Sequence, residues 1–324
     1  MMGRASGPVL GVDIGGTKVA VGIVDREGKI LAQGREPMIA SGTADSGLEA
    51  VLTAIDSMMT NEAQGKIEGI GICAPGPLDP KTGVILNPPN VPCWRNFPLA
   101  ERVSQRYSVP VKVDNDANAA ALAETQWGAA RGFRYVFYTT IGTGIGTGIV
   151  FDGSIYHGKT GSAGEGGHVS IDYRGPVCKC GKRGCIEILA SGTAIGDRAR
   201  AKLSGDTGRG SAILELAKGD IASVSSEKVA QAYTQGDAVA KEILVETVDV
   251  LIPWLGNIVD LFDPDVLVVG GGVAAMLRSF FDDIKGRLPS WCVNPRASEI
   301  PLVMAHYGAD AGIAGGAALC SSPH

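Results

Sequence analysis

The sequence lacks an apolar run long enough to cross a lipid bilayer, which excludes a membrane protein built from spanning helices. A span needs about 20 apolar residues. The most apolar stretch, Val248–Phe262, is interrupted by Asp249, Pro253, Asn257 and Asp260, so we interpret it as a buried core helix. The residues before the first strand-like run hold one arginine and no apolar segment of the kind that a signal peptide needs. We therefore expect a cytoplasmic protein.

An excess of positive charge is also missing. The formal net charge is −5, so the chain offers no overall positive field that would attract a phosphate backbone. We expect no nucleic-acid partner and no membrane partner. With 324 residues, 45% of them hydrophobic, the chain is long enough for two subdomains with a substantial core.

Cysteines are few for a chain of this length, seven in 324 residues, and this argues against a disulfide framework. Cys73, Cys93, Cys292 and Cys320 are scattered and are typical of small buried hydrophobic residues. The remaining three lie close together in the sequence.

A pattern of strand, Gly-rich turn and strand occurs twice, first over Val9–Ile14 and Lys18–Val24 and again over Tyr135–Thr140 and Ile145–Phe151. The repetition predicts two related α/β halves. The other expected strands are Ile30–Gly34, Ile67–Cys73, Val111–Asp114, Val266–Val269 and Pro301–Ala305. The expected helices are Ser46–Met59, Pro98–Tyr107, Ala117–Trp127, Ser191–Leu203, Glu227–Tyr233 and Asp237–Phe262.

The first Gly-rich turn, Asp13–Lys18, is a candidate phosphate site. Gly15 and Gly16 allow backbone N–H groups to approach phosphate oxygens, while Thr17 adds a hydroxyl and Lys18 a cation. Asp13 can hold Mg²⁺ through water. The stretch is not a Walker A loop, because position 17 is threonine where that motif needs lysine. An ordinary hairpin turn is the alternative.

Two later glycine clusters add nucleotide candidates. In Thr140–Gly148, glycine at alternate positions weakens a strand unless a ligand or another backbone comes close. This predicts a second phosphate-contacting turn with Thr143, Gly144 and Gly146; close strand packing is the alternative. Gly270–Gly272 also fits a loose dinucleotide fingerprint, so an NAD-dependent enzyme is a rival, but the next expected strand provides no acid for a ribose. Gly271 and Gly272 suit an adenosine-contacting loop equally well.

The most specific pattern is His168 with Cys178, Cys180 and Cys185. Three cysteines and one histidine on a short turn match the ligand set of a tetrahedral structural zinc site. Free thiols or a redox pair are the alternatives. Zinc on one nitrogen of His168 leaves the other as an N–H donor. Glu165 and Glu187, close to the ligands in sequence, add carboxylates that suit a polyhydroxylated ligand.

Asn115 and Asp116 follow directly after an expected strand and precede an Ala-rich helix. A carboxylate at such a strand end can accept the proton of a substrate hydroxyl that attacks phosphorus, and Asn115 can orient a neighbouring hydroxyl. A helix N-cap is the alternative interpretation, and both roles can coexist.

Taken together in this order, these motifs resemble the ROK family of sugar kinases and repressors over nearly the whole chain. The carriers of the resemblance are Asp13–Lys18, Asn115–Asn118, Gly164–His168 and Cys178–Glu187. The resemblance implies an actin-like ATPase fold of the hexokinase and Hsp70 type, with two α/β domains around a nucleotide and sugar cleft. The expected domains are residues 1–116, completed by a C-terminal helix at 309–324, and residues 117–308 with the zinc loop.

The resemblance also implies an ATP-dependent hexokinase that transfers the γ-phosphate to a hexose hydroxyl, with Mg²⁺ and structural Zn²⁺. Asp116 is then the base, and a homodimer is expected. The sugar contacts implied are Asn90, Asn115, Glu165, His168 and Glu187. Glucose, phosphorylated at its 6-hydroxyl, is the expected substrate; N-acetylmannosamine, N-acetylglucosamine, allose and fructose are alternatives, and a polyphosphate donor stays open. The family's repressors carry a helix-turn-helix before the first motif, for which twelve residues give no room, so we expect a kinase. A non-enzymatic sugar sensor is the minor alternative.

Overall fold

The computed structural model describes residues 7–59, 67–205 and 210–321. The chain divides into two compact units. Unit 1 comprises residues 1–138, 148–164 and 305–324, and unit 2 comprises residues 139–147 and 165–304. The domain division expected at residue 116 stays a prediction, while by compactness residues 117–138 and 148–164 group with unit 1.

Unit 1 is built on a five-stranded sheet with the order β3-β2-β1-β4-β7. Strands β1 to β3 form an antiparallel meander, whereas β4 and β7 run parallel to β1. The order places β7 at one edge. The strands are β1 Val9–Ile14, β2 Lys18–Val24, β3 Ile30–Pro37, β4 Ile70–Ala74 and β7 Val111–Asn115, with a separate hairpin of β5 Leu78–Asp79 and β6 Val84–Ile85.

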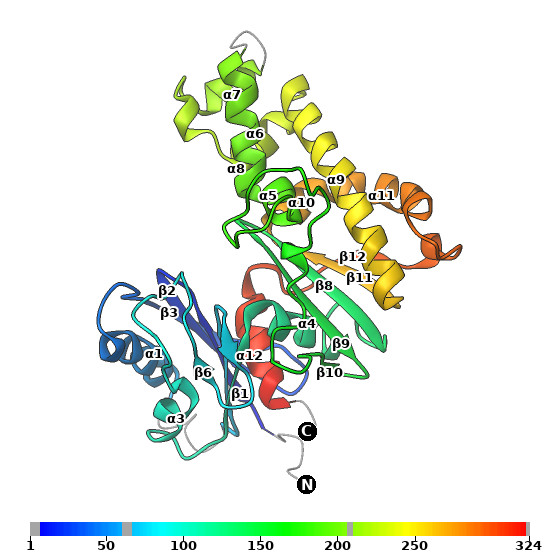
Figure 1. Cartoon of the computed structure of the whole chain (residues 1–324). Helices are drawn as coiled ribbons and strands as arrows, with labels where there is room; N and C mark the ends of the chain where they lie inside the picture. The colour runs from blue at the N-terminus through cyan, green and yellow to red at the C-terminus, as the bar shows by residue number, and fades with distance from the viewer. Residues whose placement is uncertain (1–6, 60–66, 206–209, 322–324) are drawn as a thin grey trace. The chain divides into compact units, whose positions relative to one another are not determined.

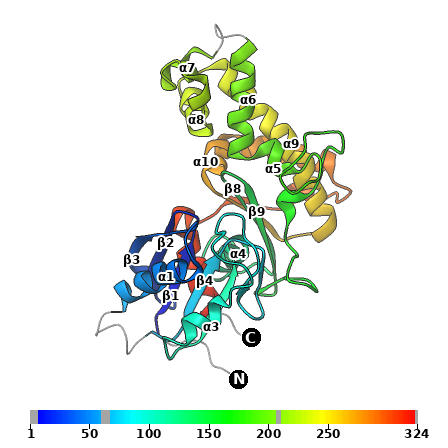
Figure 2. The same cartoon turned by 60° about the vertical axis from the view of Figure 1, so that its left-hand side comes forward.

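The two faces of this sheet are covered by different helices because successive side chains point to opposite faces. Leu10, Val12 and Ile14 of β1 belong to the larger core, which they share with α1. Val9 instead packs with Ile313 of α12 in a second, smaller cluster. Figure 2 shows α1 and α3 in front of the strands of this sheet. The helices of unit 1 are α1 Ala44–Met58, α3 Leu99–Ser104, α4 Asp116–Gln126 and α12 Ala311–Ser321.

A second five-stranded sheet has the order β10-β9-β8-β11-β12, with β11 and β12 parallel (Figure 1). Its strands are β8 Tyr135–Ile141, β9 Ile145–Phe151, β10 Ser154–Ile155, β11 Val266–Gly270 and β12 Leu302–Met304. The helices of unit 2 are α5 Ile186–Ala190, α6 Gly192–Gly205, α7 Ser211–Leu216, α8 Ser226–Thr234, α9 Ala238–Phe262, α10 Gly272–Leu277 and α11 Phe281–Arg287. A single 3₁₀ turn, η1 Gly166–His168, matters for the site.

The long helix α9 confirms the interpretation of the most apolar stretch. Asp237 caps it, since its Oδ1 accepts hydrogen bonds from the N–H groups of Val239 and Ala240 at 2.9 Å each. Pro253 lies inside the helix, which continues to Phe262. Within the described residues, no helix combines the length and the apolar character needed to span a membrane.

Several predicted boundaries were wrong, each for a local reason. Helix α3 ends at Ser104, not Tyr107, and the Ser104 hydroxyl bonds back to the Glu101 carbonyl at 2.8 Å, a bond that competes with helical continuation. Strand β3 runs on to Pro37, which an edge strand tolerates. Helix α6 begins at Gly192, not at Ser191, because Ser191 adopts an extended backbone and separates α5 from α6.

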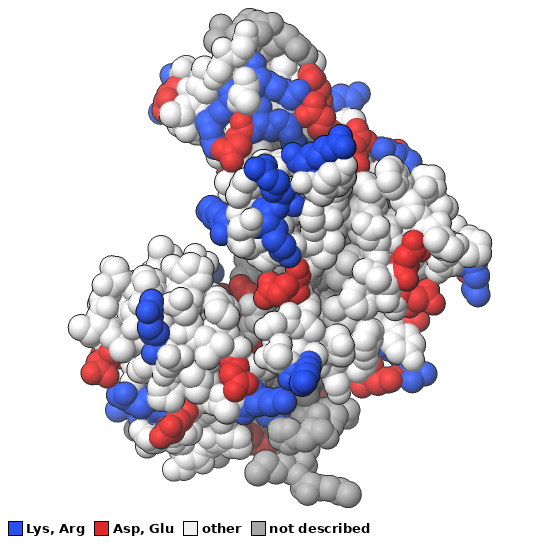
Figure 3. Space-filling view, in the orientation of Figure 1, with Lys and Arg blue, Asp and Glu red and all other residues white. Residues whose placement is uncertain are grey.

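Charged side chains are interleaved on the face displayed in Figure 3, where Lys and Arg lie among Asp and Glu. On α6 and α9 this alternation makes ion pairs. Lys202 Nζ lies 2.7 Å from Glu242 Oε1 and 2.8 Å from Glu246 Oε1. Arg198 and Arg200 of α6 also form ion pairs, with Glu246 and Asp197, so the basic residues of α6 are paired within the protein.

Candidate active site

The first Gly-rich turn joins β1 to β2 in unit 1. The β1–β2 register ends at Ile14 and Val19, and the Gly15 N–H donates to the Lys18 carbonyl at 2.9 Å. A Cβ on Gly16 would lie 2.8 Å from the Asn90 carbonyl oxygen. Gly16 therefore allows the Asn90 backbone to approach the turn closely, so two predicted elements of the site lie side by side.

Asp13 lies on the face of β1 that α12 covers, directly before this turn. Its pKa is raised to about 6, first because the carboxyl is buried and second because Asp116 adds negative charge nearby; Lys18 opposes this effect. Two carboxylates that repel each other in a partly dry environment form a site whose charge a cation would balance.

Asn115 and Asp116 lie at the junction of β7 and α4. Asn115 caps the helix: its Oδ1 accepts from the Ala117 N–H at 3.0 Å and from the Asn118 N–H at 3.5 Å. Asp116 is the first residue of α4 and is exposed, and its Oδ1 accepts from the Ala117 N–H at 2.8 Å. The N-cap role suggested as an alternative thus belongs to Asn115, and Asp116 lies in the first turn of the helix.

Asp114 was missed by the sequence analysis, although it anchors this junction. It is buried, and its Oδ1 accepts from the Asn115 N–H at 2.7 Å and from Asn118 Nδ2 at 3.2 Å. His157 donates from Nε2 to Asp114 Oδ2 at 2.6 Å. The partner is distant in sequence, so no local spacing could have revealed the pair.

In unit 2, the segment Glu165–His168 is held by two hydrogen bonds through Gly166. Its N–H donates to Thr147 Oγ1 at 2.8 Å, and its carbonyl accepts from Trp254 Nε1 at 3.1 Å. Glu165 is exposed and His168 is half-buried. The 3₁₀ turn η1 therefore presents an acid and an imidazole from a fixed backbone.

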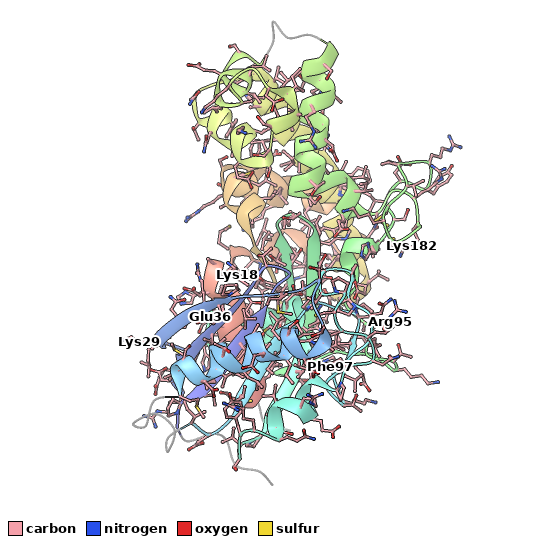
Figure 4. All side chains as sticks on the ribbon, turned by 90° about the vertical axis from the view of Figure 1, so that its left-hand side faces the viewer. Lys18, Lys29, Glu36, Arg95, Phe97 and Lys182 are labelled. Carbon is pink, nitrogen blue, oxygen red and sulfur yellow. The ribbon has the colours of Figure 1, made fainter. Side chains whose placement is uncertain are left out.

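The four predicted metal ligands come together in unit 2. The ligand atoms of His168, Cys178, Cys180 and Cys185 all lie within 4.8 Å of one another. Cys178 Sγ is 3.7 Å from His168 Nδ1, and Cys180 Sγ is 3.6 Å from Cys185 Sγ. The loop between the last two cysteines carries Lys182, labelled in Figure 4.

Glu187 is fixed beside the second Gly-rich turn of the chain, the one that contains Thr143 and Gly144 and belongs to unit 2. Its Oε2 accepts from the Ile145 N–H at 3.0 Å. A Cβ on Gly144 would lie 2.5 Å from the same oxygen. Gly144 therefore makes room for the Glu187 carboxylate. The sequence analysis had instead assigned Gly144 to phosphate contact.

A cavity of about 430 Å³ in unit 2 lies beside this turn. Among the predicted nucleotide residues, Thr143 and Gly272 line it, whereas Gly144, Gly146 and Gly271 do not. The sequence analysis missed the other wall, because it comes mainly from α6 and the start of α8, which share no motif. These additional lining residues include Gly192, Thr193, Gly196, Arg200, Ser225 and Glu227.

Thr193 connects the turn to α6, since its hydroxyl donates to the Thr143 carbonyl at 2.8 Å. Gly192 N–H donates to the Gly142 carbonyl at 2.7 Å. Gly271, with φ 89°, precedes α10 directly. Two helix N-termini thus adjoin one Gly-rich turn, an arrangement that suits a negatively charged ligand.

These features define a two-unit α/β protein with a carboxylate at a strand–helix junction and Gly-rich turns, as in the actin-like ATPase fold. The comparisons with known proteins then fix the family: the chain belongs to the ROK family, whose profile matches residues 9–322. A glucokinase of Thermotoga maritima is 32% identical over 96% of both chains. A glucokinase of Streptomyces coelicolor is 34% identical over 98% of both.

A solved structure extends this likeness. The ROK family glucokinase from Streptomyces griseus, in complex with glucose and AMPPNP, has a TM-score of 0.82 and 35% identity, and the match covers 97% of this chain and 99% of the other. The family and the actin-like ATPase fold expected from the motifs are therefore confirmed. The dinucleotide interpretation of Gly270–Gly272 is not supported.

Proposed function

We propose that this chain is an ATP-dependent hexokinase that phosphorylates the 6-hydroxyl of glucose. The observation that carries the proposal is the pair of carboxylates in unit 1, with exposed Asp116 on a helix N-terminus close to half-buried Asp13. The relatives named above are glucokinases, which supports glucose as the acceptor.

In the proposed reaction Asp116 is the general base. It accepts the proton of the sugar hydroxyl while the hydroxyl oxygen forms a bond to the γ-phosphorus and the bond from that phosphorus to the ADP oxygen breaks. Asn115 lies next to it, with its own side chain fixed as the cap of α4. The proton acceptor is therefore held on a rigid element.

Mg²⁺ fits the environment of Asp13. Burial and Asp116 both disfavour the negative charge on this carboxyl, and a hydrated divalent cation held by Asp13 would relieve that cost. When bound, the ion neutralises phosphate charge that develops during transfer. The N–H groups of Gly15 and Gly16 and the side chains of Thr17 and Lys18 are the proposed phosphate donors in unit 1.

Sugar recognition is assigned to five polar residues. Two of them, Asn90 and Asn115, belong to unit 1; Glu165, His168 and Glu187 belong to unit 2. Carboxylates accept hydrogen bonds from sugar hydroxyls, whereas the asparagine amides donate and accept. Glu187 and His168 each lie on a backbone that the structure holds in place, which favours a defined orientation of the sugar.

Adenosine is assigned to the cavity of unit 2. Its volume of about 430 Å³ falls in the range of small-molecule sites, about 300–1,000 Å³. Thr143 and Gly272 line it from the Gly-rich segments predicted for nucleotide binding, and Thr193 and Glu227 add polar groups.

A structural zinc ion fits the cluster of three cysteines and His168. Tetrahedral zinc, with Zn–S bonds of about 2.3 Å and Zn–N bonds of about 2.05 Å, separates two sulfurs by about 3.8 Å and a sulfur from a nitrogen by about 3.6 Å. The observed separations are 3.6 and 3.7 Å. Since Nδ1 of His168 faces the cluster, Nε2 is left as the N–H donor toward the sugar. The ion's role is to fix the fold of this loop.

Homodimer formation remains a prediction from the family resemblance, and cytoplasmic location remains a prediction from the sequence. The preferred acceptor is tested by supplying purified protein and MgATP with glucose, N-acetylmannosamine, N-acetylglucosamine, allose and fructose in parallel. We expect the highest kcat/KM with glucose. A clear preference for an N-acetylhexosamine contradicts the acceptor assigned here, and binding of sugars without ADP release with any of them supports the sensor alternative.

A further inference from the structure

Unit 1 contains a cavity of about 460 Å³ along the edge strand β7. The β5–β6 turn, β10 and the helices α3, α4 and α12 complete its walls. Neither the phosphate turn Gly15–Lys18 nor Asp116 lines it. Its volume is that of a small-molecule site, and the function proposed above leaves it without a role.

One wall of this cavity carries a lysine that is half-buried and lacks an anionic partner. Lys112 and Asp114 lie two residues apart on β7, so both point to the same face. In the part of the chain that the structure describes, no ion pair or side-chain hydrogen bond engages Lys112, and burial lowers its pKa. The titratable group acting on it is Cys320, but burial raises the pKa of that thiol to about 11, so it is neutral at pH 7. An ammonium group partly withdrawn from water without a counter-charge is costly.

The remaining charges leave the lining net positive. Lys81, in the β5–β6 turn, adds a second ammonium group, and Ser154 adds a hydroxyl. The only carboxylate in the lining, Asp114, already accepts from His157 and two further donors. Asp79, two residues before Lys81 and outside the lining, accepts from the Thr82 hydroxyl at 2.8 Å and from the Lys81 N–H at 3.0 Å, and its charge also acts on the Lys81 ammonium group.

We propose that this cavity binds a small phosphate monoester, with its phosphate on Lys112 and Lys81 and its organic part on the apolar wall formed by Val113, Leu122 and Leu319. A phosphate monoester carries between one and two negative charges at neutral pH, which matches two ammonium groups better than a carboxylate does. Asp114 lines the cavity and also accepts from the Asn115 N–H, so the site adjoins the β7–α4 junction that carries Asp116.

Isothermal titration of the full chain with glycerol 1-phosphate tests this directly. Saturating MgADP and glucose are present, so that the nucleotide and sugar sites are filled and no transfer occurs. We expect binding by the wild type, weakened about tenfold or more in Lys112→Met. Lys29→Met is the matched control, because Lys29 is exposed directly before β3 and does not line the cavity (Figure 4), and it should bind like the wild type.

A second variant keeps the test independent of any folding defect. Ser154→Phe places a ring in the cavity from an exposed position, and it should weaken binding to a similar extent. Wild-type protein that does not bind glycerol 1-phosphate, or equal binding by Lys112→Met and Lys29→Met, overturns the site. Equally tight binding of acetate overturns the phosphate assignment. The readout requires no turnover, so it stays interpretable if the kinase assignment fails.

Discussion

Replacing Asp13 by asparagine should stabilise the ligand-free protein, and increasingly so as the pH rises. The pKa of Asp13 is raised from 3.8 to about 6, and one pKa unit corresponds to about 1.36 kcal/mol, so the ionised form costs about 3 kcal/mol in the folded state. Because the folded-state pKa lies above the unfolded one, the stability associated with this group is fully present below the unfolded value and is lost as the pH rises through 6. Asparagine cannot ionise and avoids that loss.

The assay is urea unfolding of wild type and Asp13→Asn between pH 4 and 8, followed by tryptophan fluorescence. The advantage of the variant in the free energy of unfolding should grow by about 2 to 3 kcal/mol over this range. Asp45→Asn, at an exposed position of α1, should show no such trend. Saturating MgADP should stabilise the wild type more than Asp13→Asn. The argument is refuted if the difference in the free energy of unfolding between the two proteins is constant across pH, or if the variant loses stability relative to the wild type as the pH rises. Either result would show that ionised Asp13 does not destabilise the ligand-free protein.

Three further substitutions test the remaining parts of the site. Metal analysis of the purified chain should find about one zinc ion per chain. Cys180→Ser should lose the ion, while Cys93→Ser, outside the cluster, should keep it. A metal-free wild type of full activity contradicts the zinc proposal. Gly144→Ala should lower kcat/KM for glucose by about tenfold or more, because its Cβ would lie 2.5 Å from Glu187 Oε2; unchanged steady-state kinetics would show that Glu187 does not bind the sugar. Asp114→Asn should lower kcat by about tenfold with little change in KM for MgATP, since it loosens the β7–α4 junction that holds the base; an equal loss in both parameters points to general misfolding.

The sequence predicted the fold where local patterning and tertiary structure agree. Strands β1, β2 and β9 begin and end where expected, and the α9 region was correctly assigned as one helix. Runs rich in β-branched residues, separated by Gly-rich turns, define those strands, and a capping aspartate defines the start of the helix. The two-residue strands β5, β6 and β10 were not predicted, because strands so short carry no periodicity of their own.

The spatial grouping of site residues could be predicted where they lie within one short segment of the sequence. The cluster of His168 and the three cysteines assembles as expected, since its ligands share one loop. The pairing of Asp114 with His157 and the lining of the unit 2 cavity were missed, because they join segments far apart in the chain. Gly144 shows an intermediate case: its importance was recognised, but its structural reason is the carboxylate of Glu187.

The central claim is that Asp116 is the base in phosphoryl transfer from ATP to glucose. It is tested by following glucose 6-phosphate formation from MgATP and glucose with wild type, Asp116→Asn and Asp282→Asn, the last an exposed acid in the first turn of α11. We predict that Asp116→Asn lowers kcat by about 10²- to 10⁴-fold while glucose binding, measured separately, is retained, and that Asp282→Asn turns over like the wild type. Turnover by Asp116→Asn equal to that of the wild type would contradict the account.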